Sequence, residues 1–294
     1  MKKVGLALSG GGARGLAHIG VLKVLDKLKV RPTCVSGCSM GSVVAAFYCL
    51  GYSGKQIEKK VDEITTKQLL RFIFSRKSNG DKIENFLNKL LQDKNFEDLI
   101  IPLYINAVDV NTGEEIVFNK GNLAKAIRAS ISIPMIFKPE IINDRILVDG
   151  GVREDLPIQI LIDKKMDKII GVNAHSVQKS NVKLEGVGNN KKHNQRLPTS
   201  RKILAKAIAI IQSNKHIIDF YKENCDLLII PNLTNYDSLG FSDKKKIIRL
   251  GEQAANKSEQ KIRLIFRSQI SKNNFKDFFT GGFNYKTLKS ISSS

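Results

Sequence analysis

Short apolar runs alternate along the chain with segments in which apolar residues recur every three or four positions. The runs are short and nearly continuous, which is typical of strands buried in a sheet, whereas the spaced segments are typical of helices that cover it. We therefore expect strands at residues 3–8, 33–36, 103–108, 115–118, 145–148, 168–173 and 226–230. Helices are expected at residues 16–29, 42–50, 123–130, 156–165, 203–222 and 242–265, and within 54–94.

This alternation of strands and helices predicts an α/β domain built on a largely parallel sheet. No internal repeat and no linker divides the chain, so one domain over residues 1–265 is the simplest organisation. Within it, residues 176–202 hold seven basic residues and one acidic residue, which predicts a basic mobile loop. Residues 266–294 form a polar C-terminal tail that carries Phe275, Phe278, Phe279 and Phe283.

Composition excludes wholesale disorder, because 42% of the 294 residues are hydrophobic and only 26% are charged. The 48 Lys and Arg outnumber the 28 Asp and Glu, for a formal net charge of +20. Such a charge attracts phosphates, either of nucleic acid or of anionic lipid headgroups. A transient contact with an anionic membrane surface is therefore one hypothesis, and a nucleic-acid-binding module is another, although the chain lacks a recognised nucleic-acid-binding signature.

The compartment is expected to be reducing and cytoplasmic, with the inner membrane face as an alternative peripheral location. The four cysteines (Cys34, Cys38, Cys49 and Cys225) show neither a disulfide framework nor zinc spacing. The first apolar run ends after five residues, short of the roughly 7–15 residues of a signal peptide. No stretch approaches the roughly 18 apolar residues of a membrane span.

The segment Gly37-x-Ser39-x-Gly41 matches a nucleophile elbow, a sharp strand-to-helix turn that exposes a serine hydroxyl. Glycines two residues on either side are required because backbone meets backbone there. The motif alone is weak, and an incidental serine in a turn is the alternative. An apolar run before it and a helix-compatible run after it favour the elbow, with Ser39 as nucleophile.

The glycine run at residues 10–15 admits two interpretations. Gly10-x-Gly12-x-x-Gly15 fits a dinucleotide fingerprint, but no acidic residue follows about 20 positions later, and no Gly-Lys-Ser/Thr completes a P-loop. The favoured interpretation is an oxyanion hole, in which converging backbone N–H groups bind a developing negative charge. Its candidate donors are the N–H groups of Gly10, Gly11, Gly12, Ala13 and Arg14, together with Met40 after the serine.

Two candidates could activate the serine. Asp149 follows an apolar strand and precedes Gly150-Gly151, and His175 ends another strand, so a Ser…Asp…His order is one possibility. His18 is expected to be structural, and His193 lies in the predicted mobile loop. Arg14 has two interpretations as well, since it could orient the glycine loop or bind a lipid phosphate.

Several blocks together resemble one family. They are the run from Ser9 to Leu22, Gly37-Cys38-Ser39-Met40-Gly41-Ser42, Ile127-Arg128-Ala129-Ser130-Ile131-Ser132-Ile133-Pro134 and Leu147-Val148-Asp149-Gly150-Gly151. In this order they resemble the bacterial patatin-like phospholipases, which implies a single three-layer domain with a mostly parallel sheet. Two residues depart from the family pattern, Cys38 for a frequent threonine and Met135 for a frequent glycine.

The resemblance implies a Ser–Asp dyad without a catalytic histidine. It assigns the nucleophile to Ser39, the base to Asp149 and the oxyanion role to the loop from Gly10 to Gly15. The expected function is a serine lipid acyl hydrolase (a phospholipase A, lysophospholipase or esterase) that acts through an acyl-enzyme, with no cofactor, metal or nucleic acid. The alternatives are an esterase that uses His175 and a basic membrane- or nucleic-acid-binding protein without catalysis.

Overall fold

The computed structural model describes residues 2–64, 80–175, 207–208, 210–212, 214–238 and 240–267. The predicted basic loop at 176–202 and nearly all of the predicted tail at 266–294 lie outside these residues, as do His193 and the four tail phenylalanines. The extent of the domain and the behaviour of these two segments therefore remain predictions.

The described strands form one sheet in the order β5-β6-β3-β2-β1-β7-β8, with β4 paired to β3. Strands β3, β2, β1, β7 and β8 are mutually parallel, and β4, β5 and β6 are antiparallel to their neighbours. This confirms the predicted, mostly parallel sheet. The strands are β1 (Val4–Leu8), β2 (Cys34–Gly37), β3 (Leu103–Asp109), β4 (Glu115–Phe118), β5 (Glu140–Ile142), β6 (Arg145–Asp149), β7 (Lys168–Val172) and β8 (Leu227–Ile229). Of these, β5 was not predicted.

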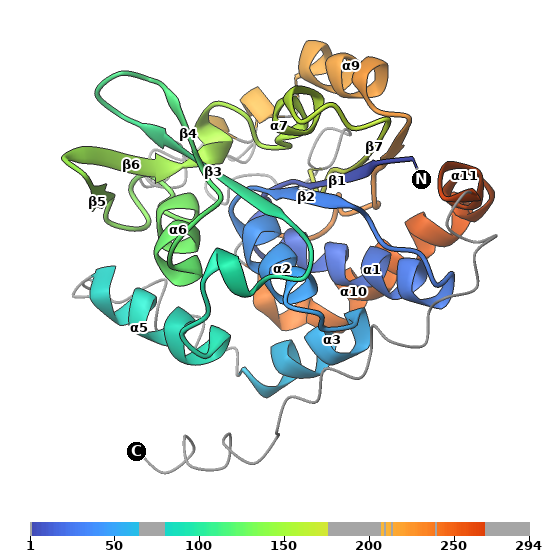
Figure 1. Cartoon of the computed structure of the whole chain (residues 1–294), viewed down its shortest axis with the longest axis horizontal. Coiled ribbons are helices and arrows are strands. Elements are labelled where there is room, and N and C mark those ends of the chain that lie inside the picture. The colour runs from blue at the N-terminus through green and yellow to red at the C-terminus, as the bar shows by residue number, and fades with distance from the viewer. Residues whose placement is uncertain are drawn as a thin grey trace, which may run out of the picture.

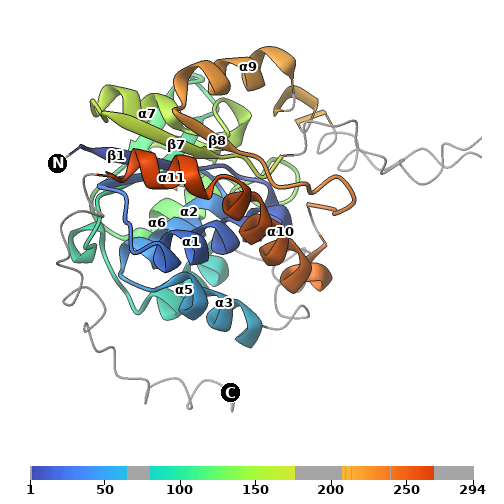
Figure 2. The same ribbon diagram turned by 90° about the vertical axis from the view of Figure 1, so that its right-hand side faces the viewer.

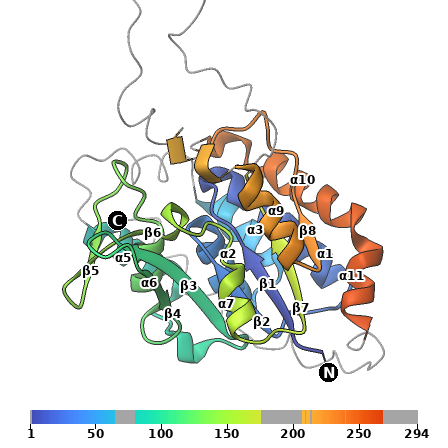
Figure 3. The same ribbon diagram turned by 90° about the horizontal axis from the view of Figure 1, so that it is seen from above.

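Helices cover both faces of the sheet and complete a three-layer α/β domain (Figures 1 and 2). The larger layer holds α1 (Ala17–Lys27), α2 (Met40–Cys49), α3 (Gly54–Glu63), α5 (Gly80–Leu91), α6 (Leu123–Ser130), α10 (Lys244–Lys257) and α11 (Glu259–Ile265). On the other face, α7 (Ile158–Asp163) and α9 (Lys215–Asn224) pack over β1 and β7 (Figure 3). None of the helices in the described ranges is both long and apolar enough to cross a bilayer.

Helices α1 and α10 cross at backbone contact. A Cβ atom added at Gly20 would lie 2.0 Å from the carbonyl oxygen of Ile248, and one added at Gly251 would lie 1.9 Å from that of Ala17. The helix predicted over 242–265 is therefore anchored on α1, but it is not continuous. Its α10 part ends in a turn at Ser258, whose N–H donates to the carbonyl of Ala255 at 3.0 Å, and α11 follows as a separate helix.

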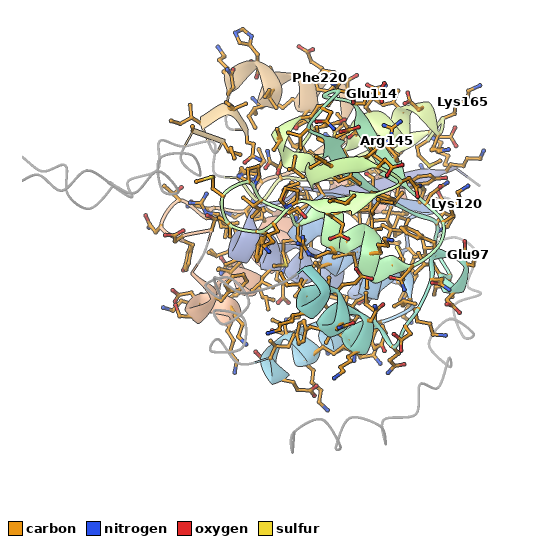
Figure 4. The ribbon with its side chains drawn as sticks, turned by 90° about the vertical axis from the view of Figure 1, so that its left-hand side faces the viewer. Glu97, Glu114, Lys120, Arg145, Lys165 and Phe220 are labelled. Carbon is orange, nitrogen blue, oxygen red and sulfur yellow. The ribbon has the colours of Figure 1, made fainter. Side chains whose placement is uncertain are left out.

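The direction of β6 decides where the site forms. Ile105 of β3 pairs with both Gly37 and Phe118, and Ala107 pairs with both Ile116 and Asp149. Strands β2 and β6 therefore lie on the same side of β3, opposite β4, and their C-terminal ends point toward each other. Arg145 at the start of β6 pairs with Glu114 next to β4, at 3.0 Å (Figure 4).

Candidate active site

Ser39 occupies a strained turn between β2 and α2. Its φ of 48° and ψ of −122° fall in a region that a residue with a side chain rarely adopts. The flanking glycines permit this turn, because an added Cβ at Gly37 would lie 2.9 Å from the backbone of Gly41, and one at Gly41 would lie 2.3 Å from the carbonyl oxygen of Leu8. The chain thus forms the elbow that the sequence predicted, with the serine at its apex.

The last turn of α6 and the segment that follows it hold both sides of the site. The hydroxyl oxygen of Ser130 accepts a hydrogen bond from the Ser39 N–H at 2.9 Å, and the carbonyl of Ser132 accepts one from the Asp149 N–H at 3.1 Å. The buried Arg128 donates to the hydroxyl of Ser132 at 2.5 Å and to the carbonyl of Lys138 at 2.7 Å. The sequence marked this segment only as a family block, because its hydrogen bonds join residues far apart in the chain.

Asp149 ends β6 as a buried carboxylate that is 6% exposed. It accepts a hydrogen bond from the N–H of Gly151 at 2.8 Å, and the thiol of Cys38 lies 3.6 Å from Oδ1. The Ser39 side chain lies close enough to lower the pKa of the carboxylate. Burial raises the pKa of Asp149 to about 6, and the neighbouring Asp155 carboxylate adds to this shift. The contacts with Ser39, Gly151 and Cys38 act in the opposite direction.

The glycine loop lies directly against the serine. An added Cβ at Gly10 would lie 3.2 Å from Cβ of Ser39, and one at Gly15 would lie 2.6 Å from Cγ of Met40. Gly12 has a φ of +56°, and a Cβ there would lie 2.2 Å from the carbonyl oxygen of Ser238. A larger residue at Gly12 would therefore require the backbone to move.

The structure narrows the set of six candidate oxyanion donors. The N–H groups of Gly10, Ala13 and Arg14 already donate to the carbonyls of Asp155 (3.3 Å), Ser238 (2.7 Å) and Gly11 (3.1 Å). Those three donors are therefore committed to holding the loop. The N–H groups of Gly11, Gly12 and Met40 donate to no acceptor within the described part of the chain, so these three remain the candidate donors.

The side chain of Arg14 belongs to the support of the loop. Its Nε donates to the carbonyl of Tyr236 at 2.7 Å, which ties the glycine loop to the segment after β8. Burial lowers the pKa of Arg14, and the nearby Asp237 carboxylate counteracts this effect. These contacts favour the orienting interpretation of Arg14.

His175 does not pair with Asp149, as the Ser…Asp…His order considered from the sequence would require. Nε2 of His175 lies 2.9 Å from Oδ2 of Asp155, a different carboxylate that the sequence did not single out. His18 is fully buried, with Nε2 2.7 Å from the carbonyl oxygen of Ser9, and burial lowers its pKa to about 4. It is therefore a neutral structural residue at physiological pH. Among the residues described, no group of three or more His, Cys, Asp or Glu could hold a metal ion.

Comparison of the sequence with known protein families identifies one family that matches this chain. Residues 6–162, just over half of the chain, match the model described as patatin-like phospholipase. A Mycobacterium tuberculosis protein described as an uncharacterized NTE family protein is 34% identical over 177 residues, or 58% of this chain and 47% of that protein. A Cryptococcus neoformans lysophospholipase NTE1 is 29% identical over 184 residues, which cover 60% of this chain and 11% of the fungal protein. The chain thus spans about half or less of the length of these curated relatives.

Among solved structures, VipD from Legionella pneumophila is similar to this chain with a TM-score of 0.49 and 15% sequence identity. The match covers 87% of this chain and 66% of VipD.

Proposed function

The chain belongs to the patatin-like phospholipase family, and from this premise we propose that it hydrolyses acyl esters of lipids with Ser39 as the nucleophile and Asp149 as the general base. The observation that carries the proposal is the position of Asp149 next to Ser39, close enough for the serine side chain to lower the pKa of the carboxylate, beside three N–H groups without a described acceptor. The two side chains come from strand ends that converge on β3, so the sheet itself holds them together.

In the first half of the reaction, the Ser39 hydroxyl attacks the ester carbonyl and Asp149 accepts the hydroxyl proton. The N–H groups of Gly11, Gly12 and Met40 stabilise the negative charge that develops on the carbonyl oxygen. Asp149 then returns the proton to the departing alcohol, which leaves the acyl group on Ser39. In the second half, Asp149 deprotonates a water molecule that attacks this ester, and it then returns the proton to the Ser39 oxygen as the acyl C–O bond breaks and the fatty acid departs.

The environment of Asp149 suits this role. With a pKa of about 6, the carboxylate is a stronger base than an ordinary Asp and is still largely ionised at neutral pH. The positive end of α2 lies at Ser39 and favours the oxyanion. We therefore expect turnover to fall in acid as Asp149 becomes protonated.

Intact-mass analysis after treatment with a fluorophosphonate tests the nucleophile directly. We expect one adduct on the wild-type protein, located at Ser39 by peptide mapping, and none on Ser39→Ala. Labelled and unlabelled enzyme are then compared on a panel of phospholipid, lysophospholipid, triacylglycerol and short p-nitrophenyl esters. Wild-type protein that hydrolyses no ester in this panel, or that is labelled elsewhere, would contradict the proposal.

The His175 alternative is separated from the dyad by two substitutions. Asp149→Asn is expected to abolish p-nitrophenyl ester hydrolysis in a folded protein, because it removes the carboxylate that lies next to Ser39 and that we propose as the base. Full activity in this variant would reassign the base to His175, and His175→Gln would then be the inactive protein.

We further propose that the enzyme reaches its substrate at an anionic membrane surface, supported by the net charge of +20. The predicted basic loop and the tail phenylalanines would supply attraction and shallow insertion. Vesicle sedimentation tests this: binding should rise with anionic lipid content and fall with salt. Binding that depends on neither anionic lipid content nor salt would contradict the membrane hypothesis, and it would leave the result of the esterase assay unchanged.

A further inference from the structure

Asp155 lies between the turn after Asp149 and the start of α7, and its side chain is only 6% exposed. Its backbone carbonyl accepts the hydrogen bond from the Gly10 N–H, and its Oδ2 faces Nε2 of His175 at 2.9 Å. Its Oδ1 accepts a hydrogen bond at 3.3 Å from Nε2 of Gln212, which also donates to the carbonyl of Gly151 at 3.0 Å. One residue therefore joins the glycine loop, the turn after Asp149 and the end of β7.

The Asp155 carboxylate lies close to both proposed reacting side chains, because each pair would meet a single Cβ atom added at Gly10 or at Gly151. An added Cβ at Gly10 would lie 2.5 Å from Oδ1 of Asp155 and 3.2 Å from Cβ of Ser39. An added Cβ at Gly151 would lie 2.8 Å from the same Oδ1 and 3.1 Å from Oδ1 of Asp149. Asp155 thus lies near the serine at Gly10 and near the base at Gly151. At both positions a Cβ atom would collide with Oδ1 of Asp155, which explains why each is a glycine.

We propose that Asp155 is a positioning residue of the proposed hydrolase, held by His175 and Gln212, which fixes the glycine loop against Ser39 and acts through its charge on the Asp149 carboxylate. This inference rests on the proposed function of Ser39 and Asp149. Asp155 acts through other residues, because its described contacts are with Gly10, His175 and Gln212.

The charge effect has a definite direction. A second buried carboxylate disfavours the ionised form of Asp149, in addition to the larger effect of burial, and raises its pKa. The other titratable groups that interact with this cluster are Glu154 next to Asp155, Cys38 before the elbow, His175 after β7, His18 of α1, Tyr221 of α9 and Glu115 of β4. A Cβ atom added at Gly151 would meet both carboxylates and the Nε2 of Gln212.

The test is the pH dependence of the rate at which a fluorophosphonate labels Ser39, compared between the wild-type protein and Asp155→Asn. The substitution keeps the shape of the side chain and removes its charge. We expect the midpoint of the acid limb to move down by about 1 pH unit, because a neighbouring like charge no longer opposes ionisation of Asp149. The alkaline plateau should fall, by up to about tenfold, because Asp149 with a lower pKa is a weaker base.

Two controls separate charge from structure. Gln212→Ala removes an uncharged partner of the same carboxylate, and we expect the midpoint to stay unchanged whatever happens to the plateau. Glu259→Gln removes one carboxylate from a surface ion pair with Arg263 on α11, and neither the midpoint nor the plateau should change. A midpoint shift in either control as large as that of Asp155→Asn would overturn the inference that the Asp155 charge sets the midpoint.

An Asp155→Asn protein that is folded and slower at every pH, with the wild-type midpoint, would overturn the inference and leave only a structural role. If that variant does not fold, His175→Ala tests the same idea, since removing the ring that faces Oδ2 leaves the Asp155 charge less compensated. The midpoint should then move upward, and an unchanged midpoint would again overturn the inference. Wild-type protein without any label on Ser39 would instead refute the proposed function.

Discussion

Replacing Asp149 by Asn should make the protein inactive and, above pH 6, more stable. The carboxylate is buried beside Ser39, and its pKa is raised from 3.8 to about 6, chiefly by burial. The folded protein therefore holds this proton more tightly than the unfolded chain does. As the pH rises through this window, the folded state must ionise a buried group that the unfolded chain ionises in water, and stability is lost.

The magnitude follows from the shift. One pKa unit corresponds to about 1.4 kcal/mol, so a shift of about two units costs the wild-type protein about 3 kcal/mol once the pH is well above 6. The amide of Asn bears no such cost at any pH. Between pH 5 and pH 8, the difference in unfolding free energy between variant and wild type should therefore grow by about 1.4 kcal/mol in favour of the variant.

Urea unfolding followed by circular dichroism at pH 5 and pH 8 measures this difference. Packing changes caused by the amide are independent of pH and cancel in the comparison. Glu154, whose pKa burial raises to about 7, titrates in the same range, but it is present in both proteins and cancels as well. A stability difference that is equal at the two pH values would refute the account of Asp149 as a base made stronger by burial.

Four further outcomes are expected. Gly12→Ala should lose ester hydrolysis and destabilise the fold by more than about 2 kcal/mol in urea unfolding, because φ is +56° and the carbonyl of Ser238 leaves no room for Cβ. Ser39→Gly and Ser39→Ala should both be inactive, but the glycine variant should be more stable by about 1 kcal/mol, since it relaxes a φ of 48°. Ser130→Ala should slow fluorophosphonate labelling by about tenfold or more in a protein with unchanged circular dichroism, because the Ser39 N–H loses its acceptor. Ester hydrolysis should be unchanged by a chelator, and loss of activity that added calcium restores would contradict the metal-free mechanism.

Much of the site could be read along the chain, because its parts are local. The elbow needs glycines at fixed distances from Ser39, and backbone contacts at Gly37 and Gly41 explain that spacing. The apolar runs marked seven of the strands, because a strand buried in a sheet must be apolar over its whole length. The sequence did not predict the short edge strand β5, because its middle residue Ile141 is 67% exposed and the strand contains no buried apolar run.

The direction of a strand relative to its neighbours cannot be read from the apolar pattern of the sequence. The sequence placed Asp149 at the end of an apolar strand but did not reveal that β6 runs antiparallel to β3, which brings its end to meet that of β2. The same limit applies to Ser130, which supports the elbow from 91 residues away, and to Asp155, which takes His175 as its partner.

The sequence by itself determined the alternation of strands and helices, the tight turn at Ser39, the glycine loop and the family blocks. Each of these is imposed on neighbouring residues by burial periodicity or by the space that a Cβ atom needs. The tertiary structure alone decided which carboxylate meets the serine, which N–H groups stay available, and which histidine pairs elsewhere. Those outcomes depend on strand order and on hydrogen bonds between distant segments, and a pattern read along the chain does not record distance in space.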